Sequence, residues 1–432
     1  MEINNTSNSL VPAFKFGVPN ERVLLAKDTV SITVDGNVYD GNGDVWLELL
    51  PRAGIYIYAE FQEIPPLVTM RIGGGEKEIT SFAFGKREFP GDFVELGGDV
   101  SNGKMTLKWS PESEPLIGVG DDATSIHCIV FHLFNFKDIT GSTTNIIELA
   151  AGSWKVELRS LVETPDCFKK LKSEGGYGLT HIGCLKKPDG SSFSGKEAGE
   201  TLDALRLFFS FAKGISCEPI CAVGFDNSNT RVWESWSAPK EPWYSPTSWI
   251  DQYHREQLPC LFPGFMRRWE DGNWRDALYE VIYWYLNSNY HLREIDTGII
   301  LTQVAIERIS YEYAVKHRKL IEAKGFNKLK ASDQFRLLFS SLDIPLDIST
   351  ATPEMIKLAK QFNWLDAPHA MTEVRNSLIH PVHRRINSAL IEVWKLGLWY
   401  LELTILRICG YDGTYNNRLV SEVEDVPWKR RD

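Results

Sequence analysis

IHCIVFHLFNF, residues 126 to 136, is apolar at every position except for two histidines and one asparagine. A strand with one exposed face alternates apolar and polar residues, whereas a strand covered on both faces is apolar almost throughout. This stretch therefore predicts a strand in the middle of a covered sheet. The chain on either side of it can be interpreted from there.

The surrounding chain, from about residue 28 to 165, has the alternating or β-branched pattern of antiparallel strands, as in the segments 55–58, 104–109 and 154–158. Four dipeptides tolerate positive φ and predict tight reversals between strands: Asp35-Gly36, Asp40-Gly41, Asn42-Gly43 and Asn102-Gly103. We expect an antiparallel β-sandwich or barrel within a β-rich domain of residues 1–195. A polar stretch over residues 166–195 is the predicted linker that closes this domain.

Residues 196–272 are of mixed type and predict an α/β bridging region, with a helix over 199–213 and a strand over 220–225. A loop with four tryptophans follows: Trp233, Trp236, Trp243 and Trp249. Indole rings can stack on unpaired nucleic-acid bases, but packing between domains is the role we expect for them.

From residue 273 onward, apolar residues recur at helical spacing. The predicted helices are 274–288, 296–320, 331–342, 352–362, 368–379 and 384–408. We expect an all-helical bundle over residues 273–415 and a C-terminal tail over 416–432. The predicted fold class is therefore a multi-domain α+β protein.

Composition limits the class of protein. The chain has 432 residues, with 43% hydrophobic and 24% charged residues, as is ordinary for a globular protein of two or three domains. Its net charge of −10 argues against non-specific coating of nucleic acid, but not against a local basic cleft. Residues 1–10 lack a secretory pattern, no stretch reaches about 18 apolar residues, and the seven cysteines suit reduced thiols. We expect a cytoplasmic protein with no membrane contact.

One short segment has a chemical interpretation, and it ends a predicted helix just before Pro381. The segment is Glu373-Val374-Arg375-Asn376-Ser377-Leu378-Ile379-His380. Asn376 and His380 share a helix face, and the long side chain of Arg375 reaches the same region. Pro381 should end the helix and free the imidazole of His380.

These side chains are suited to RNA cleavage without a metal. Histidine can transfer protons near neutral pH, and arginine can hold phosphate oxygens in a bidentate fork. The 2′-hydroxyl would attack the adjacent phosphate, so DNA would be spared. In the structural alternative, Arg375 forms a salt bridge with Glu373 and His380 caps the helix.

The segment from Arg375 to His380 resembles the signature of HEPN domains, in which an arginine, a polar residue and three variable residues precede a histidine. Segments 284–289 and 304–308 also look like HEPN domains of bacterial abortive-infection proteins, so the resemblance covers about residues 273–415. A β-rich region before a C-terminal HEPN domain is similar to the layout of ApeA-type anti-phage proteins. Pro381 departs from the family pattern, which commonly has a small residue there.

The resemblance implies roles and an assembly. Arg375 and His380 would be catalytic, with Asn376 as the polar position between them. HEPN domains usually pair so that two motifs line one cleft, which implies a homodimer or higher homo-oligomer for a chain with one motif.

Basic residues near the motif are candidate RNA contacts. They are His383, Arg384 and Arg385 after the motif, and Lys316, Arg318 and Lys319 in a basic stretch before it. The alternative for the basic stretch is a solvated helix end, where lysine also favours the helix dipole.

Glu307 is a candidate carboxylate that orients Arg375 or His380, although it could equally form a surface pair with a neighbour such as Arg308. A zinc site is not expected, because the spacing of the nearby thiols and imidazole lacks closed ligand pairs. The residues concerned are His181, Cys184, Cys217 and Cys221. We expect neither a metal nor a cofactor.

The sequence thus predicts a metal-independent endoribonuclease of cellular RNA, with tRNA as one candidate substrate. It would act as a toxin or anti-phage effector, while the β-rich domain senses a phage-derived or host protein or restrains the nuclease. In the alternative, the bundle is a non-catalytic dimerisation or RNA-binding module and the β-rich domain binds a protein or glycan. Pro381 is the feature that favours this alternative.

Overall fold

A computed structural model of the chain describes residues 10–34, 36–62, 79–99, 104–137, 139, 146–290, 294–380 and 385–429. The chain forms two compact units, each built from separated segments. The first contains residues 1–135, 158–201 and 219–244, and the second contains residues 136–157, 202–218 and 245–432. Within the described ranges, none of the helices combines the length and the apolar character that crossing a bilayer requires.

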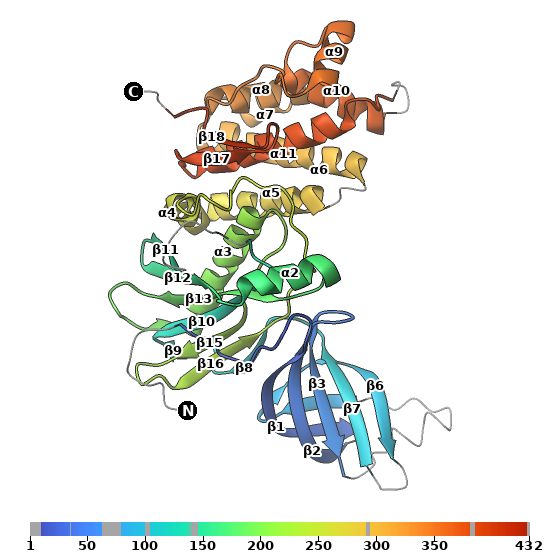
Figure 1. Cartoon of the computed structure of the whole chain (residues 1–432), viewed down its shortest axis with the longest axis vertical. Coiled ribbons are helices and arrows are strands. Elements are labelled where there is room, and N and C mark those ends of the chain that lie inside the picture. Colours follow the sequence, from blue (N-terminus) through green and yellow to red (C-terminus); the bar gives the residue numbers. More distant parts are fainter. Residues whose placement is uncertain are drawn as a thin grey trace. The chain divides into compact units, whose positions relative to one another are not determined.

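The first unit begins with a seven-stranded antiparallel sheet that curves like half of a barrel (Figure 1). Its strand order is β5-β4-β1-β2-β3-β7-β6. The bounds are β1 Val23–Val34, β2 Asn37–Glu48, β3 Gly54–Phe61, β4 Ile79–Phe84, β5 Arg87–Glu88, β6 Gly91–Asp99 and β7 Lys104–Pro111. Alternate residues of these strands are buried, such as Val45 and Leu47 on β2. The predicted strands 55–58 and 104–109 are confirmed.

Two of the predicted reversals are wrong. The chain does turn at Gly36, which has a φ of 80° between β1 and β2. Gly41 and Gly43, by contrast, lie inside β2 and pair with both neighbouring strands. A Cβ on Gly41 would collide with the carbonyl oxygen of Glu60, so close packing rather than turning requires glycine there. The Asn102-Gly103 pair lies outside the described residues.

The strand at residues 126–136 has the central position predicted for it. β10 (Cys128–Phe134) is hydrogen-bonded to β13 (Leu179–Lys186) on one side and to β15 (Ile220–Phe225) on the other. Two further strands, β16 (Arg231–Trp236) and β8 (Leu116–Val119), continue the sheet beyond β15. A short pair, β9 (Ser125–Ile126) with β14 (Phe193–Ser194), lies in the same unit.

The linker predicted over residues 166–195 is wrong, because this segment is folded. It contains most of helix α2 (Thr164–Glu174), together with β13 and β14. Cys167 and Leu171 are buried on one side of α2, while Lys169 and Lys172 are exposed on the other. The polar residues that suggested a linker therefore form the solvated face of a helix.

The second unit is mainly helical. Its helices after residue 245 are α4 Gln257–Glu270, α5 Gly272–Tyr290, α6 Ile295–Tyr311, η2 Glu312–His317, α7 Ala323–Phe326, α8 Ala331–Ser341, α9 Pro353–Phe362, α10 Ala367–Ile379 and α11 Leu390–Ile408. The unit also takes in β11 (Ile146–Ala151), the first part of β12 (Trp154–Ser160) and most of α3 (Gly195–Lys213). The chain is thus a mixed α+β protein with a β-rich N-terminal region and a helical C-terminal region, as predicted.

Three details of the helical region differ from the prediction. Helix α4 was missed, because Pro263 resembles a helix breaker although it lies inside the helix. The helix predicted over 296–320 ends as an α-helix at Tyr311 and continues as the π-helix η2. The last helix begins at Leu390 rather than at residue 384.

The tryptophans of the predicted loop are mostly interior. Trp233 and Trp236 are buried in the first unit and Trp249 in the second, where its ring stacks on Phe211 at 5.6 Å between centroids. Trp243 is half-buried. Three of the four rings are therefore unavailable to nucleic-acid bases.

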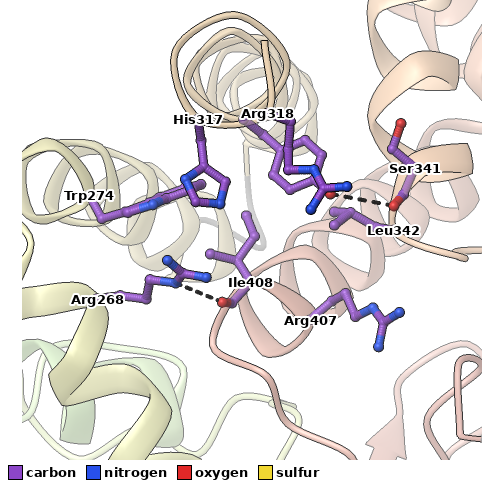
Figure 2. A pocket seen from close by; sticks show the side chains of 9 residues that line it. Arg268, Trp274, His317, Arg318, Ser341, Leu342, Arg407 and Ile408 are labelled. Carbon is purple, nitrogen blue, oxygen red and sulfur yellow. Dashed lines mark hydrogen bonds between the residues drawn. The ribbon is translucent and has the colours of Figure 1, made fainter. Parts of the chain in front are cut away.

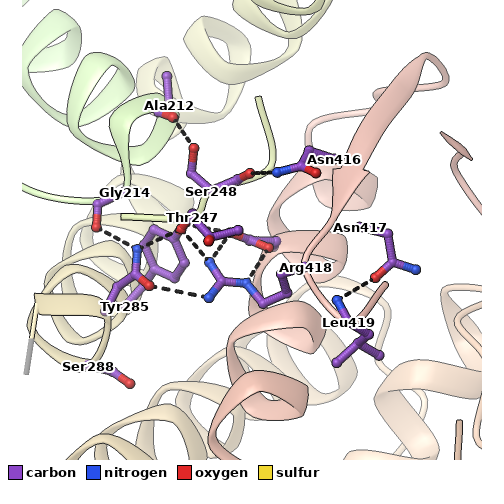
Figure 3. A network of polar contacts seen from close by, with 12 residues as sticks. Ala212, Gly214, Thr247, Ser248, Tyr285, Ser288, Asn416, Asn417, Arg418 and Leu419 are labelled. Atoms are coloured by element: carbon purple, nitrogen blue, oxygen red, sulfur yellow. Dashed lines mark hydrogen bonds and ion pairs between the residues drawn. The ribbon is translucent and has the colours of Figure 1, made fainter. Parts of the chain in front are cut away.

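The segment after residue 415 is not a free tail. It contributes to the hairpin of β17 (Thr414–Asn417) and β18 (Glu422–Asp425) and places Arg418 in the interior. The guanidinium of Arg418 donates to both carboxylate oxygens of Glu402 on α11, at 2.6 and 2.9 Å. It also donates to the Thr247 carbonyl at 2.9 Å (Figure 3). Tyr285 on α5 donates to the same carboxylate at 2.7 Å. A buried ion pair thus connects the C-terminal hairpin with two helices.

Candidate functional site

The Arg375–His380 motif forms the end of helix α10. The carboxylate of Asp366 caps the start of the helix by accepting a hydrogen bond from the His369 amide at 2.9 Å. The helix ends at Ile379, and His380 is extended, with a φ of −106° and a ψ of 115°. Pro381 had predicted this termination, and the imidazole of His380 is exposed as a result.

Arg375 is half-buried and held from α6. Its Nη2 lies 4.0 Å from Oε1 of Glu307, and its Nη1 lies 3.4 Å from Oδ1 of Asn376. Its Nε is buried and has no hydrogen-bond partner among the described residues. The guanidinium is therefore positioned through its two terminal nitrogens, which face Glu307 and Asn376.

Glu307 lies next to Arg375, as its predicted role of orienting Arg375 or His380 requires. Burial raises the pKa of its carboxyl, and the nearby Arg375 opposes that rise. Arg308, the alternative surface partner, pairs instead with Glu280 at 2.6 Å and with Glu312 at 2.8 Å. Within the described chain, the carboxylate paired with Arg375 is thus that of Glu307 rather than Glu373.

Two residues that sequence reasoning missed support this arrangement. Gln303, one turn before Glu307 on α6, is buried and donates to the Met371 carbonyl of α10 at 2.8 Å. Ser377, inside the motif, is buried and accepts a hydrogen bond from the Ile386 amide at 3.2 Å. The Gln303 partner is distant in sequence, and the Ser377 partner lies beyond the end of the helix, so helical spacing alone predicts neither contact.

The predicted RNA contacts are not brought together. Arg385 is exposed and forms an ion pair with Asp296, near the start of α6. Lys316 pairs with Glu312 at 2.9 Å, and Arg318 and Lys319 follow η2 beyond the other end of α6. These two ends are separated by about 22 Å of helix. His383 and Arg384 lie outside the described residues.

Of the residues weighed as a zinc site, His181, Cys217 and Cys221 are buried and Cys184 is half-buried. Burial raises the pKa of Cys217 to about 11 and that of Cys221 to about 12, and it lowers the pKa of His181 to about 3. Both thiols are therefore protonated at neutral pH. Over the described ranges, no three His, Cys, Asp or Glu side chains are grouped in a way that could hold a metal ion.

The fold and the site together define a mixed α+β protein with an Arg–His motif at the end of a helix in its helical unit. Residues 271–427 match the family described as the YopA C-terminal domain, and residues 121–246 match the YopA central domain. The first match spans the helices from α5 to α11 and the C-terminal hairpin.

A relative is known from Bacillus subtilis (strain 168), where it is called the SPbeta prophage-derived uncharacterized protein YopA. The two chains are 33% identical over 276 residues, which is 61% of this chain and 61% of that protein. The alignment thus covers less than two thirds of the relative. No solved structure gives a significant match.

Proposed function

We propose that this protein is a metal-independent endoribonuclease with Arg375 and His380 as its catalytic residues. The observation that carries the proposal is the position of Arg375: its guanidinium is half-buried, lies 4.0 Å from the carboxylate of Glu307, and precedes an exposed histidine by five residues. A guanidinium held in this way suits a phosphate that an adjacent imidazole can act upon.

In the proposed reaction the imidazole of His380 accepts the proton of a ribose 2′-hydroxyl. The 2′-oxygen attacks the adjacent phosphorus, the bond from phosphorus to the 5′-oxygen breaks, and the protonated His380 returns its proton to that leaving oxygen. Arg375 stabilises the charge that builds up on the phosphate oxygens, and Asn376 supports it with its amide. The products are a 2′,3′-cyclic phosphate and a 5′-hydroxyl.

We further propose that helices α5 to α11 form a HEPN-type bundle that works as a homodimer or higher homo-oligomer, and that the curved N-terminal sheet belongs to a β-barrel-like domain. Ile379, inside the motif at the end of α10, and Ile391, after the motif at the start of α11, are exposed apolar residues. A second copy of the chain would remove such side chains from water.

The proposed biological role is that of a cytoplasmic toxin or anti-phage effector. Support comes from the resemblance of the motif to HEPN nucleases and from the prophage origin stated in the name of the Bacillus relative. The β-rich region would bind a phage-derived or host protein as trigger, or restrain the nuclease, because unrestrained RNA cleavage would poison the host.

The test uses purified full-length protein, cellular RNA and an excess of EDTA. Wild type should cleave RNA, and His380→Ala and Arg375→Ala should each slow cleavage by roughly 10²- to 10⁴-fold. The matched control is His254→Ala, which removes another partly exposed histidine of the same unit. Binding of RNA without cleavage, or cleavage that EDTA abolishes, would contradict the proposal and favour a non-catalytic RNA-binding module.

A further inference from the structure

The second unit contains a cavity of about 260 Å³ near the C-terminal end of α6. Its walls come from α4, the start of α5, η2, and the C-terminal ends of α8 and α11. Figure 2 shows Arg268, His317 and Arg318 around the side chain of Ile408, with the guanidinium of Arg407 at the edge and turned away from them.

The cavity carries positive charge that is only partly neutralised. Arg268 donates its Nε to the Ile408 carbonyl at 2.9 Å, and its guanidinium lies over the Trp274 ring, 5.2 Å from the ring centroid. Arg407 pairs with the exposed Asp343 at 2.8 Å. Within the part of the chain that the structure describes, neither Arg268 nor Arg318 has a carboxylate within ion-pair distance.

The backbone is distorted where it supplies two of these side chains. Successive residues of an α-helix point about 100° apart, yet His317 and Arg318 both line the cavity. The widened turn of η2 accounts for this, with the Arg318 amide donating to the Tyr313 carbonyl at 2.8 Å. Lys319 follows with a φ of 50°, which is unfavourable for lysine. π-helical turns and such strained residues occur frequently at functional sites.

Helix capping is the structural alternative. Arg268 and Arg407 lie in the last turns of α4 and α11, where cations interact favourably with the helix dipole. Arg318 is the C-cap residue of η2, but capping does not account for the cavity that all three guanidinium groups line. Arg318 was among the predicted RNA contacts, but the cavity is smaller than the roughly 300–1,000 Å³ of pockets for drug-sized ligands.

We propose that this cavity binds the terminal phosphate group of a small phosphorylated molecule. The guanidinium groups of Arg268 and Arg318 supply forked donors for phosphate oxygens, His317 supplies a further polar contact, and Arg407 adds charge at the rim. A doubly charged terminal phosphate fits this site better than a singly charged phosphodiester, because two arginines there lack acidic partners. The proposal is independent of the ribonuclease activity.

Direct binding to the full-length protein tests the proposal. The probes are inorganic phosphate, pyrophosphate, AMP and, as a control without phosphate, adenosine, each followed by calorimetry at constant ionic strength. We expect at least one phosphate probe to bind with a Kd below about 1 mM, and adenosine not to bind. Comparison of AMP with inorganic phosphate distinguishes a nucleotide from free phosphate as the source of the group.

Arg318→Gln should weaken this binding roughly 10- to 100-fold, because Arg318 is exposed and its loss should not disturb folding. Arg268→Gln should have a similar effect. Arg267→Gln is the matched control, since Arg267 is the exposed neighbour on α4 that does not line the cavity. Its binding should equal that of wild type.

A spectroscopic readout covers the case in which the Arg268 variant misfolds. Burial, Arg268 and Arg318 lower the pKa of His317, against the effects of Asp271 and Glu312. A bound phosphate should raise that pKa, as NMR of the His317 ring would show. Absence of binding by every phosphate probe, or binding unaffected by Arg318→Gln, would overturn the proposal.

Discussion

Arg375 is a charged side chain whose orientation depends on another helix. Its partner Glu307 is 37% exposed, and their atoms are 4.0 Å apart, so the pair is a partly solvated one that contributes less than about 1 kcal/mol. The value of this contact lies in restricting the guanidinium, because a mobile arginine would place its charge on the phosphate only part of the time.

The first prediction follows from that pair. Glu307→Gln keeps the shape of the side chain and removes its charge, so we expect RNA cleavage to slow by up to about fivefold while the melting temperature stays nearly constant. Rates of wild type and variant at saturating RNA, together with thermal unfolding curves, check it. Loss of activity as complete as in Arg375→Ala would instead make Glu307 part of the chemistry.

His132 gives a prediction about pH. Its ring is buried in the first unit, where Nε2 accepts a hydrogen bond from the Ala13 amide at 3.0 Å, and burial lowers its pKa to about 4. In the unfolded chain His132 is protonated below about pH 6.5, whereas in the folded chain it is protonated only below about pH 4. The folded state therefore loses stability as the pH falls from about 6.5 to about 4.

The loss from His132 should be about 3 kcal/mol in the free energy of unfolding, and the buried His181 adds a loss in the same direction. Urea titrations at several pH values between about 7 and 4 measure it. In His132→Gln the glutamine can still accept from Ala13, and the pH dependence should become weaker. An unchanged slope would show that His132 is not the group responsible.

At the scale of elements, helices α6 and α11 approach closely through two glycines. Gly298 on α6 faces Trp394 of α11, and Gly397 on α11 faces Thr302 of α6. A Cβ on Gly397 would lie 2.5 Å from the Thr302 hydroxyl oxygen, and Thr302 is buried, so it has little room to move.

Gly397→Ala should therefore destabilise the second unit by about 1–3 kcal/mol, even though alanine favours the helix itself. Gly199→Ala is the matched control, because a Cβ at that helical position would meet no atom within 4 Å. The control should be neutral or slightly stabilising. Differential scanning calorimetry compares the two, and equal melting temperatures would refute the packing argument.

The elements also show what sequence could predict. Most helices of the second unit were predicted because their apolar faces repeat at helical spacing, and the central strand because it lacks polar positions. The π-helix could not be predicted, since the apolar pattern over residues 312–317 is compatible with either kind of turn. Helix α4 could not be predicted because Pro263 locally disfavours a helix. In the folded chain, tertiary packing outweighs that local preference.

At the scale of the molecule, each unit is built from segments that are separated in the sequence. Residues 136–157 and 202–218, for example, belong to the helical unit although the chain around them belongs to the first unit. A local pattern cannot reveal this, because it does not say which distant segments meet. The same limit applies to the sites. The motif from Arg375 to His380 could be recognised in the sequence. Its pairing with Glu307, and the presence of Arg268 and Arg318 in one cavity, depend on the fold.

The buried pair of Glu402 and Arg418 has a similar long-range character. Arg418 lies in a segment predicted as a tail, yet its charge is compensated in the interior by a carboxylate of α11. Leaving either charge unpaired in that environment is costly, so the C-terminal hairpin is an integral part of the second unit.

Cleavage of an oligonucleotide with one ribose among deoxyriboses tests the central claim most directly. With EDTA present, the account predicts a single cut on the 3′ side of the ribose, a 2′,3′-cyclic phosphate on one product and a 5′-hydroxyl on the other. Methylation of that one 2′-hydroxyl should abolish the cut, because DNA and methylated RNA lack the attacking group. A cut in the methylated strand, or a product bearing a 5′-phosphate, would contradict the roles assigned to Arg375 and His380.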